Sequence, residues 1–144
     1  MKLLAALAAV VIVAAYAAAA GVPAKVTYVH HDKVSSVMAK GGAIVEDPGL
    51  RILAQRRGSG EAEVHETTNH VFIIVDGEAT IVPGGKLMDA KQTAPGQISG
   101  TGVAGGETHR LTKGDVITIP AKTPHWWREV PTQTVAYYAV NIEN

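Results

Sequence analysis

Three residues in one short stretch, Glu63, His65 and His70, have the types and spacing of metal ligands. Glu63 and His65 are two positions apart, so on a β-strand both side chains project from the same face. The polar segment 66–69 is typical of a turn, and a turn there allows His70 to face the other two. One carboxylate and two imidazoles that converge on a point suit a first-row transition metal such as Mn, Fe, Co, Ni, Cu or Zn. An ordinary solvated strand end explains the same residues equally well at this stage, because short spacings also arise by chance.

A second segment of interest runs from Gly114 to Trp127. Its pattern is that of a turn, an alternating strand and a second turn bounded by Pro120 and Pro124. His125 follows that turn and opens an aromatic strand. A further imidazole thus stands at the start of a strand, where it can point into a shared interior.

The two segments together resemble the paired motifs of the cupin superfamily. The first motif of that family is G-x5-H-x-H-x3-4-E-x6-G, and here Glu63 stands at its first His and His65 at its second. His70 stands at the motif's Glu, and Gly77 at its closing Gly. The positions of the carboxylate and of one imidazole are therefore exchanged relative to the family pattern.

The second cupin motif, G-x5-P-x-G-x2-H-x3-N, is matched by Gly114, Pro120 and His125. Three positions depart from the two motifs: Arg57 and Lys122 each replace a Gly, and Glu129 replaces the terminal Asn. The resemblance implies one divalent first-row transition metal. The ligands that it implies are Glu63, His65, His70 and His125.

The resemblance covers roughly residues 43–142 and implies an all-β fold. The expected architecture is a cupin-type double-stranded β-helix, or jelly-roll barrel, with the metal inside its mouth. A short N-terminal helix from Asp32 to Lys40 is expected in addition, because apolar residues recur there at helical spacing before Gly41-Gly42. The residues Val26–His30 have the character of a first strand.

Periodicity is lost between Pro83 and Glu107, where Gly is frequent. A long loop is therefore expected, forming a lid or an extra hairpin over the barrel mouth. His109 leaves this segment and is the candidate for a catalytic acid or base that is not a ligand. A solvent-exposed His is the alternative reading of the same residue.

The pocket wall is expected to include Arg57, Phe72 and Trp127. If His125 points inward, the alternation of a strand turns Trp127 and Glu129 inward as well. Arg57 shares a strand face with Gln55, and together they would contact a polar or anionic substrate. A solvated Arg at a strand end is the alternative.

Composition limits the classes of function. The chain has 144 residues, a length that is enough for one domain. It has no Cys, which excludes disulfides, a thiol nucleophile and thiolate metal sites. Its 13 basic residues balance 13 acidic ones without a basic cluster, which argues against nucleic acid as a partner.

The N-terminus indicates export. Lys2 precedes an apolar run from Leu3 to Ala20, and small residues follow it. This is typical of a secretory signal peptide, so we expect residues 1–24 to be removed, leaving a cupin domain over residues 25–144 in a secreted or periplasmic protein. A retained membrane anchor is the rival reading, but the run is rich in weakly hydrophobic Ala.

Two classes of function remain open on the sequence. The first is a mononuclear metal enzyme that acts on a small polar molecule, of the isomerase, lyase or oxygenase type. The second is a non-catalytic module that binds or senses a small molecule or the metal itself. The expected partner is a small molecule, no membrane span is expected after signal cleavage, and a homodimer is left open.

Overall fold

The computed structural model describes residues 21, 23 and 25–144 of the chain. Almost all of the predicted signal peptide, residues 1–24, therefore lies outside the described residues. One helix, α1 (His31–Lys40), is followed by the strands β1 (Gly42–Asp47), β2 (Leu50–Arg57), β3 (Ala62–His65), β4 (Thr68–Asp76), β5 (Ala79–Pro83), β6 (Lys86–Met88), β7 (Lys91–Ala94), β8 (Gln97–Gly100), β9 (Gly102–Ala104), β10 (His109–Leu111), β11 (Val116–Ile119), β12 (His125–Glu129) and β13 (Val135–Glu143). Within the described part of the chain, no helix is long and apolar enough to cross a membrane.

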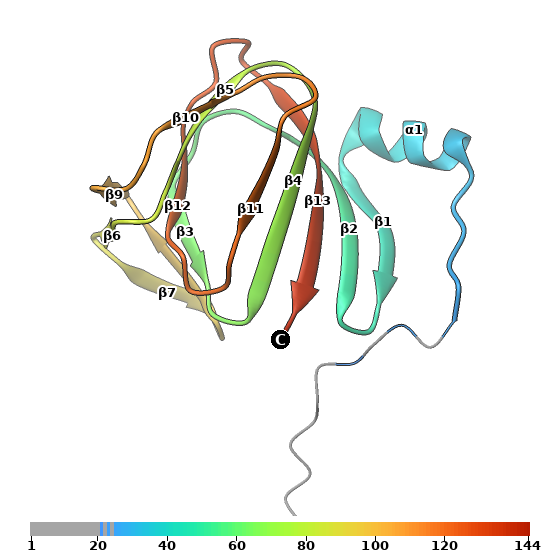
Figure 1. Cartoon of the computed structure of the whole chain (residues 1–144), viewed down its shortest axis with the longest axis horizontal. Coiled ribbons are helices and arrows are strands. Elements are labelled where there is room, and N and C mark those ends of the chain that lie inside the picture. Colours follow the sequence, from blue (N-terminus) through green and yellow to red (C-terminus); the bar gives the residue numbers. More distant parts are fainter. Residues whose placement is uncertain (1–20, 22, 24) are drawn as a thin grey trace, which may run out of the picture.

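Two antiparallel sheets form the body of the molecule. One has the strand order β1-β2-β13-β4-β11, and the other β10-β5-β12-β3-β8-β7. A separate ribbon pairs β6 with β9. Figure 1 shows α1 beside β1 and β2 at one end of the molecule, and the β6, β7 and β9 region at the opposite end. The predicted all-β, jelly-roll architecture with a short N-terminal helix is confirmed.

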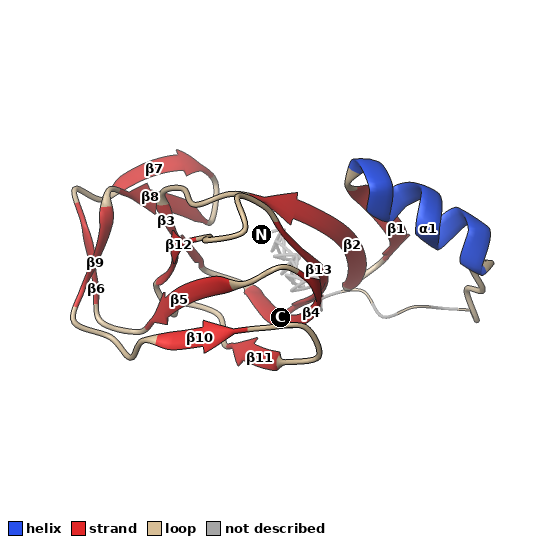
Figure 2. Cartoon of the chain, turned by 90° about the horizontal axis from the view of Figure 1, so that it is seen from above, coloured by secondary structure: helices blue, strands red, loops and turns tan. Residues whose placement is uncertain are grey.

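The hydrophobic core lies between the two sheets. Along β4 every second residue is buried, and His70, Phe72 and Ile74 share this inner face. The same alternation on β13 buries Tyr137 and Ala139. The residues between the buried ones on β4 are apolar but only partly buried, so this strand alternates in burial rather than in polarity. Seen from above in Figure 2, the two sheets curve towards each other, and the residues of this core belong to both.

The N-terminal segment differs from two expectations. The helix begins one residue earlier than predicted, and His30 caps it instead of Asp32, since the His30 side chain accepts a hydrogen bond from the backbone N–H of Asp32. The helix ends at Gly41, whose φ of 77° is readily adopted by Gly. The predicted strand Val26–His30 is wrong: the segment pairs with no neighbouring strand, and Val26 and Tyr28 are exposed.

The Gly-rich segment 83–107 is also more regular than predicted. It contains β6 to β9, of which the β7–β8 hairpin extends the second sheet by pairing β8 with β3. Gly85 has a φ of 68°, and a Cβ there would lie only 2.5 Å from the carbonyl oxygen of Ala104. Gly is thus required where the segment folds back on itself. The expectation of an irregular loop is wrong, and the alternative of an extra hairpin matches the structure.

Candidate metal centre

The chain passes from one sheet to the other between His65 and His70. Glu63 and His65 lie on β3, and after a bend at residues 66–67 the chain enters the other sheet as β4. Two backbone hydrogen bonds to other loops stabilise the bend. The Glu66 N–H donates to the Gly96 carbonyl, and the Lys122 N–H donates to the His65 carbonyl at 2.7 Å. This crossing lets His70 face residues of β3 across the interior, as the polar composition of the turn predicts.

His125 reaches the same region through strand pairing. It opens β12, and its backbone lies directly opposite Glu63 of β3 in the antiparallel register. Residues directly opposite each other in such a ladder have neighbouring side chains on the same face. The second sheet therefore contributes Glu63, His65 and His125, and the first sheet contributes His70.

The three imidazoles form a compact set. Each offers a ring nitrogen, and these nitrogens all lie within 4.8 Å of one another. The ring centroids are 4.7 Å apart for His65 and His70, and 5.4 Å apart for His70 and His125. Glu63 stands beside two of them, with carboxylate oxygens 3.7 Å from His65 Nε2 and 3.5 Å from His125 Nε2. The structure thus brings together all four residues that the sequence singles out.

The outer nitrogens of two rings are held by hydrogen bonds. His70 Nδ1 lies 2.8 Å from Asn141 Oδ1, and His125 Nδ1 lies 3.1 Å from the Thr123 carbonyl oxygen. A carbonyl oxygen only accepts, so each Nδ1 carries a proton, and in the neutral ring each Nε2 presents a lone pair. Metal-binding imidazoles are held in this way by their surroundings.

The inner nitrogens of the same rings are buried without a partner. His70 Nε2 and His125 Nε2 make no hydrogen bond to any described residue, and the two side chains are almost fully buried. Leaving a buried polar atom unpaired is unfavourable, and a bound cation is one way to satisfy two such lone pairs at once. The donor set therefore fits a divalent first-row transition metal.

Charge at the site favours the forms that bind a cation. Burial lowers the pKa of His70 to about 4, so its ring is neutral at pH 7. Burial by itself raises the pKa of Glu63, but the imidazoles of His125 and His65 and the Arg57 guanidinium outweigh it and hold this pKa well below its usual range. The neutral ring of His70 and the ionised carboxylate of Glu63 are states that metal coordination requires.

A cavity of about 330 Å³ opens in front of these residues. Besides Glu63, His65 and His70, it is lined by Arg51, Leu53, Gln55, Arg57, Phe72, Gln97, Tyr137, Ala139 and Asn141. A volume of this size lies at the lower end of the range for small-molecule sites. The β7–β8 hairpin contributes Gln97, so the Gly-rich segment helps to form the wall.

The residues named from sequence for the pocket fall in different places. Arg57 and Phe72 line the cavity, whereas Trp127 lies behind the wall, fully buried and packed against Phe72 and Tyr137. The inward orientation of Glu129 is wrong, since a bulge in β12 between Trp127 and Glu129 shifts the register and leaves Glu129 exposed.

His109 is not near the other three imidazoles. It lies on β10, beyond β5, and its ring is partly exposed 3.7 Å from Glu107. Three residues that the sequence reasoning did not single out belong to the site or its support: Arg51, Gln97 and Asn141. Asn141 could have been found only from the register that places it opposite His70.

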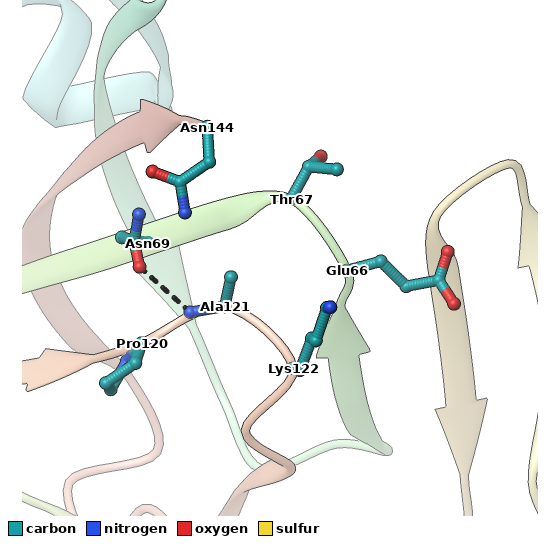
Figure 3. A pocket seen from close by; sticks show the side chains of 7 residues that line it. All are labelled: Glu66, Thr67, Asn69, Pro120, Ala121, Lys122 and Asn144. Atoms are coloured by element: carbon teal, nitrogen blue, oxygen red, sulfur yellow. Dashed lines mark hydrogen bonds between the residues drawn. The ribbon is translucent and has the colours of Figure 1, made fainter.

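A larger hollow of about 640 Å³ lies on the other side of the β3–β4 bend and contains none of the imidazoles. Figure 3 shows its lining, with the Ala121 N–H donating to Asn69 Oδ1 at 3.0 Å. Glu66 and Lys122 are its charged residues. We regard it as a surface depression that accompanies the loop before His125, because it lacks convergent chemical groups.

Comparison with solved structures gives the fold class. No protein-family model and no curated protein sequence matches the chain. BH2720 from Bacillus halodurans is similar over 81% of each chain with 14% identity and a TM-score of 0.56. A conserved protein with a double-stranded β-helix domain from Klebsiella pneumoniae is similar over 71% of this chain and 74% of its own, with 13% identity and a TM-score of 0.51.

A third similar structure is Fe(II)-HppE with the alternative substrate (S)-1-HPP. The likeness covers 71% of this chain and 48% of HppE, with 16% identity and a TM-score of 0.52. At such identities the comparisons establish the fold and nothing finer. The chain thus has the cupin-type double-stranded β-helix fold that its two motifs indicate.

Acid is expected to destabilise the metal-free protein through His70. The pKa of this residue is about 4 in the folded protein and about 6.5 in an unfolded chain. Between pH 4 and pH 6.5 the ring is therefore mostly protonated in the unfolded chain and mostly neutral in the folded protein. Stability is therefore lost as the pH falls from about 6.5 towards 4, by up to about 3 kcal/mol. Urea unfolding with a chelator present, at several pH values from 7.5 to 5, measures this slope.

The variant His70→Asn removes the titrating ring and serves as the comparison. We expect its stability to depend less steeply on pH over the same interval. Equal slopes for the two proteins would show that His70 is not the residue whose protonation opposes folding.

Proposed function

We propose that this chain is a mononuclear metalloprotein whose ligands are Glu63, His65, His70 and His125, and that it acts as an enzyme on a small polar molecule. The single observation that carries the proposal is the pair of buried, unpartnered Nε2 atoms of His70 and His125, which face His65 beside the Glu63 carboxylate. The cofactor is one divalent first-row transition metal. HppE, whose structure contains Fe(II), makes iron one of the metals to be tested.

A metal held by Glu63, His65, His70 and His125 would supply a Lewis acid at the end of the cavity. The chain's own residues would orient the ligands and form the walls of the cavity. Asn141 and the Thr123 carbonyl fix the orientation of two imidazoles, and Arg57, 3.3 Å from Glu63, holds the carboxylate. Leu53 and Phe72 are the large aliphatic and aromatic hydrocarbon side chains of an otherwise mostly polar lining.

Tyr137 is the best placed group for proton donation in the cavity. Burial raises its pKa to about 12, although the Arg57 guanidinium pulls it the other way. Its hydroxyl therefore stays protonated at neutral pH and can donate a hydrogen bond to a substrate oxygen. His109, the acid or base candidate from the sequence, does not line this cavity. The reaction types that fit are isomerisation, elimination and oxygenation of a small polar molecule.

The second candidate function is a module that holds a small molecule or the metal without catalysis. Metal-free protein reconstituted separately with Fe(II), Mn(II), Ni(II) and Zn(II) and screened for turnover of small polar compounds distinguishes the two. Metal-dependent turnover that is reduced in Tyr137→Phe supports the enzyme. Stoichiometric metal binding without turnover supports the module, and absence of bound metal in every form contradicts both.

Export of the protein is a further part of the proposal. It rests on Lys2, the apolar run to Ala20 and the small residues after it, which together form a signal peptide within residues 1–24 ahead of a domain over residues 25–144. Intact-mass measurement of the exported protein is expected to show a new N-terminus between Gly21 and Lys25. Full-length protein retained in a membrane fraction would instead indicate an anchor.

A further inference from the structure

One wall of the cavity carries positive charge at regular spacing. Arg51, Leu53, Gln55 and Arg57 alternate along β2 and all line the cavity, whereas Arg56 on the opposite face of the same strand is exposed. A strand with period two presents such a row of side chains to one side. The wall therefore holds two guanidinium groups.

These two arginines differ in how far their charge is already engaged. Arg57 lies 3.3 Å from Glu63, and its guanidinium carbon lies 5.9 Å from the centre of the Trp127 ring. Arg51 is 3.7 Å from Glu46, and both of these side chains are about half exposed or more, at 47% and 64%. An exposed ion pair of this length contributes little free energy, so Arg51 is free to exchange Glu46 for another anion.

Strand pairing places Arg51 level with the metal centre, in a row that runs across the three strands β2, β13 and β4. It lies opposite Asn141 on β13, and Asn141 lies opposite His70 on β4. Two strand spacings of about 4.8 Å put the backbones of Arg51 and His70 about 10 Å apart, measured across the strands. Asn141 stands between them and uses its oxygen on His70, which leaves its amide N–H groups as donors. A molecule of a few heavy atoms can span this row.

The charges that face the cavity select the sign of the ligand. Glu63 is the single carboxylate among the lining residues, against Arg51 and Arg57. The described lining thus has an excess of one positive charge, and a divalent cation adds two more. A cationic ligand would meet net repulsion, whereas an anion would meet attraction.

We infer that the cavity takes a small organic anion, a carboxylate or a phosphate monoester, whose charged group pairs with Arg51 and Asn141 while the rest of the molecule extends towards the imidazoles. This inference rests on the proposed function, because it names the substrate class of the same site. Arg51 offers a planar fork that binds either oxyanion in a bidentate manner. The row of three residues positions the reacting end of the molecule at the metal centre.

Calorimetric titration of the zinc-loaded protein tests the inference. The probes are lactate and glycerol 3-phosphate, each compared with its uncharged counterpart, lactamide or glycerol. We expect an anion to bind more tightly than its counterpart, and Arg51→Ala to weaken that binding at least about tenfold, as loss of a charged hydrogen-bonded pair predicts. The matched control Arg56→Ala removes the same charge from the other face and is expected to change binding less than about twofold. Which of the two anions depends on Arg51 identifies the oxyanion.

The two proposals fail in different ways. Zinc content is measured on the same samples, and we expect Arg51→Ala to keep it, since Arg51 is not a ligand. Full zinc content with equal anion binding in the wild type and Arg51→Ala overturns the anion inference alone, as does failure of both anions to bind better than their counterparts. Absence of zinc from the wild type contradicts the metal site, and the same titrations on that metal-free protein still report on Arg51, with equal binding again overturning the inference.

Discussion

His70→Ala is expected to reduce the metal content of the purified protein from about one equivalent to a small fraction of one. The ring supplies a nitrogen that is buried, unprotonated at neutral pH and fixed in orientation by Asn141. Loss of a residue that merely orients a ligand lowers metal affinity 10- to 100-fold, and loss of the ligand itself is expected to exceed about 100-fold. Elemental analysis after dialysis against a weak chelator, with circular dichroism as the check on folding, measures the effect.

Two imidazoles outside the site provide matched controls. His31 belongs to an exposed cluster with His30 and Asp32, and His109 lies partly exposed beside Glu107. We expect His31→Ala and His109→Ala to keep the full metal content. Full metal content in folded His70→Ala would remove His70 from the ligand set, and loss of metal in His31→Ala would move the site to the N-terminal cluster.

The local part of the site could be predicted from the sequence because short spacings fix side-chain direction. Glu63 and His65 are two residues apart on one strand, and no other part of the chain is needed to place them on one face. The polar bend at residues 66–67 then turns His70 towards them. His125 required the resemblance to a family, since nothing in its own segment says which strand lies beside it.

The support around the site could not be predicted, because it depends on register between distant strands. Asn141 is 71 residues from His70 in the chain and becomes its partner only because β13 pairs with β4 in one register. A slip of one residue would turn Asn141 to the other face of the sheet. Arg51 joins the same row for the same reason, through the pairing of β13 with β2.

The errors in the sequence-based fold have local physical causes. Strands β6 and β9 have three residues each, and β7 and β8 have four, so they are too short to show periodicity among the glycines. The bulge after Trp127 breaks an alternation that is otherwise regular, which exposes Glu129. A bulge inserts one unpaired residue, and composition alone gives no sign of it.

Trp127→Ala is expected to cause the largest loss of folding stability of any substitution considered for this chain. The indole is fully buried and stacks on Tyr137 with ring centroids 4.8 Å apart, and its ring centroid lies 5.6 Å from that of Phe72. Replacing a buried Trp by Ala costs about 3–5 kcal/mol, which is a large part of the 5–15 kcal/mol that stabilises a typical domain. Urea unfolding of the metal-free protein measures the change in the midpoint at constant slope.

The neighbouring residue separates burial from residue type in the same experiment. Trp126 faces the other side of β12, is only partly buried, and packs against a smaller cluster around Ala62, Val82 and Val103. We therefore expect Trp126→Ala to lower the free energy of unfolding by less than Trp127→Ala. Because Phe72 and Tyr137 form the cavity wall on the far side of Trp127, its removal should also weaken anion binding even where the imidazoles keep their metal. Equal destabilisation by the two Trp variants would contradict the larger contribution of the buried indole, and unchanged anion binding in Trp127→Ala would show that Trp127 does not hold the wall of the cavity in place.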